Sequence, residues 1–122
     1  MREAGVLQVG NSVYRLYREG RFRGLFILER NGKVLACAEK PSALARSFNV
    51  RYGNKSYILE VESIFRRRFV LRETGGEIGS ISPEKACYRN AIIDLPVELS
   101  LPVRLFMAWL TLLLWKREAD SA

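Results

Sequence analysis

The chain has 122 residues, of which 48% are hydrophobic and 27% are charged, and these values are typical of one globular domain. We therefore expect a single domain over residues 1–122. Twenty Lys and Arg residues against thirteen Asp and Glu residues give a formal charge of +7. Such an excess favours an anionic partner: phospholipid headgroups, an acidic protein or nucleic acid.

The sequence offers little for catalysis. It contains no histidine, so the usual general base near neutral pH is missing, and none of the common nucleotide-binding, kinase or hydrolase motifs is present. Cys37 and Cys87 have no Cys or His neighbour, which excludes the usual zinc-ligand spacings. We expect a non-enzymatic protein with no cofactor and no metal ion, in which both thiols are reduced and pack as small hydrophobic side chains.

The first ten residues contain no apolar run of the length found in a signal peptide. Together with the two unpaired cysteines, this favours a cytoplasmic protein, which could also be peripheral to a membrane or anchored in one.

Residues 6–94 are predicted to form a meander of eight or nine short antiparallel strands, because apolar residues recur at the two-residue period of strands. Tyr14 and Leu16 share one face of the first part of this region. Asn31-Gly32 between two apolar runs is the strongest hairpin signal in the chain.

Two further hairpins and a last strand follow. Gly53-Asn54 predicts a hairpin between residues 48–52 and 57–61, and Gly75-Gly76 predicts one between residues 69–72 and 77–81. A last strand is expected over residues 87–93. Residues 40–46 and 83–86 are predicted to be connectors, and Ser42 could cap one helical turn in the first of them.

Residues 101–117 are predicted to form a helix that is apolar on every side, because Thr111 is the only polar residue between Leu105 and Trp115. Such a helix must be enclosed. Residues 103–115 would span only about 20 Å, whereas a bilayer core of about 30 Å needs about 20 apolar residues. Enclosure in a protein core is therefore favoured over a tail anchor, in which residues 101–115 would enter the bilayer, and over burial in an oligomer.

A long meander exposes two sheet edges unless it closes, and the helix needs an enclosure. Both needs are met if the sheet wraps around the helix. The predicted fold is mostly β (α+β): an antiparallel β-barrel or a strongly curved meander of about eight or nine strands enclosing a hydrophobic C-terminal helix.

The order of these elements resembles a known family. Hairpins lead to the glycine-bearing stretch 76–81 (Gly-Glu-Ile-Gly-Ser-Ile) and then to the hydrophobic helix 101–115, as in the tubby C-terminal-like fold of tubby domains, plant LURP-one-related proteins and phospholipid scramblases. The resemblance covers about residues 12–117. It implies a barrel filled by the terminal helix and activity at membranes.

Family barrels usually have more strands, so the resemblance implies an abbreviated, bacterial-type member or a homodimer that completes the barrel. No residues match the phosphoinositide site of tubby domains or the calcium site of scramblases, so neither site is carried over.

Two arginine clusters are the candidate sites for an anionic partner. The predicted residues are Arg15, Arg18, Arg21, Arg23, Arg66, Arg67 and Arg68. In a strand, Arg67 would point away from Arg66 and Arg68. They are interpreted either as a landing patch for an acidic membrane or partner, or as a solvated rim that protects the sheet edge from aggregation.

Nucleic acid is a further alternative, because aromatic residues that could stack on bases lie among the arginines. These residues are Tyr14, Tyr17, Phe22 and Phe69. Glu60 and Glu62 share one face of a predicted strand, where we expect them to face Arg or Lys rather than to act as a catalytic pair.

Overall fold

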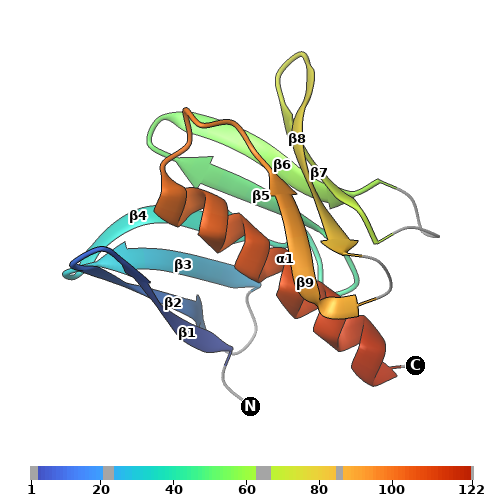
Figure 1. Cartoon of the computed structure of the whole chain (residues 1–122), viewed down its shortest axis with the longest axis horizontal. Coiled ribbons are helices and arrows are strands. Elements are labelled where there is room, and N and C mark those ends of the chain that lie inside the picture. Colours follow the sequence, from blue (N-terminus) through green and yellow to red (C-terminus); the bar gives the residue numbers. More distant parts are fainter. Residues whose placement is uncertain (1–2, 21–23, 63–66, 85–86, 122) are drawn as a thin grey trace.

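A computed structural model describes residues 3–20, 24–62, 67–84 and 87–121. Nine strands precede one helix in these residues (Figure 1). The strands are β1 (Ala4–Val9), β2 (Ser12–Glu19), β3 (Leu25–Arg30), β4 (Lys33–Glu39), β5 (Ser47–Tyr52), β6 (Lys55–Val61), β7 (Phe69–Glu73), β8 (Gly76–Glu84) and β9 (Cys87–Asp94). The helix is α1 (Leu101–Ser121), which continues four residues beyond its predicted end.

The nine strands form one antiparallel sheet in which each strand pairs with its neighbours in the chain, from β1 to β9. The predicted meander is confirmed, although it begins at Ala4 rather than at residue 6. Among the strands that the structure describes, β1 and β9 are the two edges and do not pair with each other, so the sheet is not closed into a barrel. Figure 1 shows the sheet curved around α1, with β1 to β3 below the helix in this view, β4 passing behind it and β5 to β7 above it.

The concave face of the sheet carries the hydrophobic core. Each strand from β2 to β7 contributes two buried residues at positions i and i+2, as strand alternation requires. These residues are Tyr14, Leu16, Phe26, Leu28, Ala36, Ala38, Phe48, Val50, Tyr57, Leu59, Phe69 and Leu71. They pack against α1, which places the predicted apolar helix inside the curve of the sheet.

The helix is buried on most of its surface but not on all of it. Val103, Phe106, Met107, Leu110 and Trp115 are fully buried. The buried Thr111 hydroxyl donates to the backbone carbonyl of residue 107 at 3.0 Å, so its polarity is satisfied within the helix. A second set of apolar side chains on one side of α1 is only partly buried: Leu105, Trp109, Leu112 and Leu113. The prediction of burial on every side is therefore wrong for this side: Trp109, Leu112 and Leu113 pack against the core but keep part of their surface exposed.

The turns follow the predicted glycines. Asn31 and Gly32 both have positive φ values, 53° and 78°, as the two-residue turn between β3 and β4 requires. Gly53 begins the turn between β5 and β6 with φ 63°. These positions tolerate left-handed backbone because glycine lacks a Cβ and asparagine is the side chain that adopts it most readily.

Two details of the connectors differ from the prediction. Residues 40–46 form no helical turn; the Ala45 amide instead donates to the Ser42 carbonyl, which closes a single tight turn. Pro83 is not in a connector but in β8, opposite Ala91, where the pairing register shifts next to it. A proline in a strand removes one donor from the ladder, and such an irregularity accommodates that loss. Cys37 is a free thiol, as predicted.

Candidate anion-binding site

Three cationic side chains from distant parts of the chain lie together where the end of α1 meets the sheet. Arg18 lies near the end of β2, Lys40 follows β4 directly, and Arg117 lies in the last turns of α1. We call these three residues the basic site. All three line a pocket of about 390 Å³, which Glu39 also borders. Arg18 and Arg117 also line a second pocket, of about 480 Å³, on whose border Lys116 lies.

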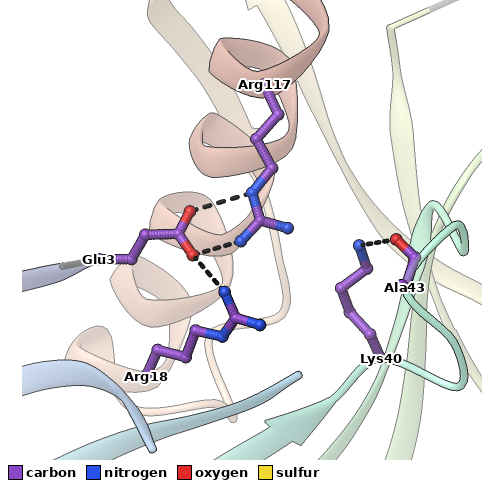
Figure 2. A network of polar contacts seen from close by, with 5 residues as sticks. All are labelled: Glu3, Arg18, Lys40, Ala43 and Arg117. Atoms are coloured by element: carbon purple, nitrogen blue, oxygen red, sulfur yellow. Dashed lines mark hydrogen bonds and ion pairs between the residues drawn. The ribbon is translucent and has the colours of Figure 1, made fainter. Parts of the chain in front are cut away.

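Glu3, the residue before β1, is held by two of these cations. Arg117 donates to its carboxylate through Nε at 3.0 Å and through a terminal nitrogen, and Arg18 donates from a terminal nitrogen at 3.4 Å (Figure 2). The Glu3 side chain is only 17% exposed. Two guanidinium groups thus converge on one carboxylate, and bidentate arginine contacts of this kind are typical of carboxylate and phosphate recognition.

Lys40 is the third cation, and it has no carboxylate at hydrogen-bonding distance in the described part of the chain. Its ammonium group donates to the backbone carbonyl of Ala43 at 3.0 Å (Figure 2). Burial lowers the pKa of Lys40, and the charges of Arg117 and Arg18 lower it further, against a smaller opposing effect of Glu3. Two cations near Lys40 thus outweigh the one carboxylate that favours its charged form, while Glu39 adds a second carboxylate to the border of the same pocket.

Gly24 allows Lys40 to lie where it does. The Lys40 amide donates to the Gly24 carbonyl at 2.8 Å, and a Cβ added at Gly24 would lie 2.9 Å from the Cβ of Lys40. Any larger residue at position 24 would push the lysine away from the basic site.

Part of this arrangement has a structural role. The Glu3–Arg117 pair joins the residue before β1 to the C-terminal part of α1. That role accounts for Arg117 and Arg18. It does not account for Lys40, whose charge is disfavoured by its surroundings.

The first predicted arginine cluster is only partly represented in the basic site. Arg18 belongs to it, whereas Arg15 lies on the convex face of β2, is largely exposed and pairs with Glu29 at 3.5 Å. Arg21 and Arg23 lie outside the described residues.

The second predicted cluster has a different setting. Arg66 lies outside the described residues. Arg68 pairs with Glu62 and, at 3.2 Å, with Glu77, and both hydrogen bonds raise the pKa of Arg68. Arg67 is half-buried, and its backbone carbonyl accepts a hydrogen bond from Trp115 Nε1 at 2.8 Å.

Arg68 and Arg72 flank Val70 on the convex face of β7. Arg72 pairs with Glu60 at 2.9 Å, and Val70 between the two arginines is fully buried although it is not part of the core cluster on the concave face. The prediction that Glu60 faces a basic side chain is confirmed, as is the same prediction for Glu62. This convex group is a ladder of ion pairs over an apolar residue.

The aromatic residues among the arginines are not arranged for base stacking where the structure describes them. Tyr14 is 8% exposed and Phe69 is fully buried, and both belong to the core. Tyr17 donates its hydroxyl to Glu29 at 2.6 Å. Phe22 lies outside the described residues.

Sequence reasoning did not identify Lys40, Glu3 or Arg117 as residues of the site. Glu3 and Arg117 are 114 positions apart, and Lys40 lies in a connector without a charge run. No local pattern joins them; the only signal was the general excess of positive charge.

No family model, curated protein or solved structure matches this chain. Among the described residues there is no helix both long and apolar enough to cross a membrane. The same residues contain no group of three or more acidic, Cys or His side chains placed to hold a metal ion.

Proposed function

We propose that this protein is a non-enzymatic binding domain that attaches to anionic phospholipid surfaces through the basic site. The observation that carries the proposal is the convergence of Arg18, Lys40 and Arg117 from three separate elements beside open pockets. In a solvated rim, each cation would be separately exposed to water and would not share a pocket with the others. The net charge of +7 would add long-range attraction to an acidic membrane.

The phosphate and carboxylate groups of lipid headgroups fit the donors of the basic site. Guanidinium groups bind such oxyanions with parallel hydrogen bonds, and an ammonium group adds a point charge. A headgroup at this site would share Arg18 and Arg117 with the Glu3 carboxylate. Attachment of this kind makes the protein peripheral to a membrane, in keeping with the cytoplasmic location expected from the sequence.

The test is sedimentation of the protein with liposomes of phosphatidylcholine alone or with added phosphatidylserine, over a series of salt concentrations. We expect binding only with phosphatidylserine, and we expect it to weaken as salt rises. Each basic residue near an acidic membrane contributes about 1 kcal/mol, so the double variant Lys40→Gln/Arg117→Gln should bind about 30-fold more weakly.

The control Lys33→Gln/Arg51→Gln removes the same charge from exposed positions in β4 and β5. It should retain most of the affinity. Lys40→Gln alone breaks no ion pair of Arg117, so it separates loss of binding from loss of the Glu3 contact. Equal losses in the two double variants, or equal binding to neutral liposomes, would contradict the proposal. Changing Arg66, Arg67 and Arg68 to Ser tests the second predicted cluster in the same assay.

We further propose that the fold is an abbreviated relative of the tubby C-terminal-like fold. Support comes from the order of elements, a sequential antiparallel meander that curves around a following hydrophobic helix. In this proposal, the gap between β1 and β9 takes the place of missing strands. An experimental structure in which a second copy completes the sheet, or in which the gap stays open, would decide between a homodimer and a trimmed monomer.

A further inference from the structure

One side of α1 remains partly exposed, and this side leads to the basic site. Leu105, Trp109, Leu112 and Leu113 recur at the spacing of a single helix face and are all partly buried. Leu101 extends the same face by one turn and is 43% exposed. The distance along the helix axis from Leu101 to Leu113 is about 18 Å. We call these five residues the apolar stripe.

The open sheet covers the apolar stripe only in part. The described edges of the sheet, β1 and β9, both contact α1 without pairing with each other. The backbone of Gly5 in β1 lies beside Trp109, since a Cβ added there would be in ordinary contact with Trp109 Nε1 at 3.7 Å. Trp109 also contacts Phe26 edge-to-face at 5.9 Å between ring centroids, so its indole is held in place.

The pocket of about 480 Å³ joins the two features. Trp109 and Leu113 of the apolar stripe form its apolar part, while Arg18, Lys116 and Arg117 supply positive charge beside them. Glu3 and Asp120 also border this pocket, and Glu3 is already bonded to the two arginines. Its volume lies in the usual range for small-molecule sites. An apolar surface that ends in cations is complementary to a molecule with a hydrocarbon chain and an anionic head.

We propose that this pocket and the apolar stripe bind one anionic amphiphile, with its acidic head at Arg18 and Arg117 and its single alkyl chain along Trp109 and Leu113. The inference rests on the proposed function for its headgroup contacts and adds a binding position for the alkyl chain. A chain in this position would bury half-exposed leucine and tryptophan surface, which is the favourable term for apolar ligands. A free anion could use only the basic end.

Trp109 offers a direct probe, because it lies in the pocket whereas Trp115, the only other tryptophan, is fully buried. The experiment is a titration of the whole protein with dodecyl phosphate below its micelle concentration, followed by tryptophan emission. We expect a saturable change in emission that is lost in Trp109→Phe. Inorganic phosphate should bind at least about 100-fold more weakly, since each buried methylene adds to affinity.

Two matched variants test the position of the chain. Leu113→Glu places a carboxylate in the pocket and should weaken dodecyl phosphate binding by at least about 10-fold. Val97→Glu introduces the same charge at a residue that is 79% exposed in the loop before α1, and it should leave binding unchanged. Because Trp109→Phe removes the fluorescence signal, isothermal calorimetry measures the affinity of that variant for dodecyl phosphate.

Several results would overturn the inference. Equal affinity for dodecyltrimethylammonium would show that the charge is not recognised, and equal affinity for inorganic phosphate would show that the stripe is not used. An emission change that depends on protein concentration and not on amphiphile would assign the stripe to a second copy of the chain. If dodecyl phosphate does not bind but phosphatidylserine liposomes still bind in a Lys40-dependent manner, this inference is wrong and the proposed function stands. If neither dodecyl phosphate nor the liposomes bind, the inference and the proposed function are both wrong.

Discussion

Replacing Leu110 by Ala tests whether the C-terminal helix is the core of this protein. Leu110 is fully buried against the concave face of the sheet. Truncation of a buried leucine to alanine costs about 3–5 kcal/mol, because transfer free energy is lost and a cavity remains. For a domain of this size, that loss corresponds to a fall in melting temperature of about 10–20 °C.

Leu112→Ala is the matched control, since it makes the same change in the same helix two residues away. Leu112 is on the half-exposed side of α1, so its truncation removes less buried surface and leaves a cavity open to solvent. We expect a loss of roughly 1–2 kcal/mol. Helix propensity changes equally in the two variants, so the difference between them reports burial alone.

Urea unfolding followed by far-ultraviolet circular dichroism measures both free energies of unfolding. The denaturant slope should be the same in the two variants, because they expose the same surface on unfolding. Equal stabilities of Leu110→Ala and Leu112→Ala, or a Leu110→Ala protein as stable as the wild type, would refute the enclosure of α1 by the sheet.

Three further predictions follow from single contacts. Gly79→Ala should cost about 1–3 kcal/mol in urea unfolding, since a Cβ there would lie 2.6 Å from the Asp94 carbonyl oxygen, and an unchanged midpoint would contradict that contact. The hydrogen bond to Glu29, burial and the Glu29 charge raise the pKa of Tyr17 above 10.0. The stability that this pair contributes is therefore present below pH 10.0 and is lost as the pH rises through the pKa of the native state. NMR titration of the Tyr17 ring should show a lower pKa in Glu29→Gln. Lys40 should titrate below 10.5 by NMR, so its charge lowers the stability of the fold until the pH rises through that lowered pKa. Added inorganic phosphate should raise the pKa of Lys40. A pKa that does not change with phosphate would argue against an anion at the basic site.

The meander was predictable because its signals are local. Alternating residues such as Phe48 and Val50 identify a strand with one buried face, and Asn31-Gly32 specifies a turn that only a hairpin uses. The apolar helix was predictable for the same reason. Pro83 was misassigned because sequence patterns place proline outside strands, whereas the register shift beside it allows β8 to continue.

Closure of the sheet depends on curvature summed over nine strands, and no short pattern encodes that sum. For the same reason, the sequence did not predict that one side of α1 stays partly exposed. The basic site was only partly predictable because tertiary contacts assemble it. Arg18 belongs to a cluster that is visible in the sequence, whereas Lys40 and Arg117 join Arg18 only in the folded protein, where all three line one pocket.

The position of the core in the chain also shapes how the protein folds. Every strand pairs with its neighbour in sequence, so the hairpins close short loops and can form early. Their inner face, with Phe26, Phe48 and Phe69, has nothing to bury against until α1 is available. During synthesis, residues 4–94 emerge before the helix and must wait with an apolar surface exposed, which makes this interval the one most open to aggregation and to chaperone binding. A chain cut short before Leu101 would keep its hairpin signals and lose its core, so it should be recognised as unfolded and degraded.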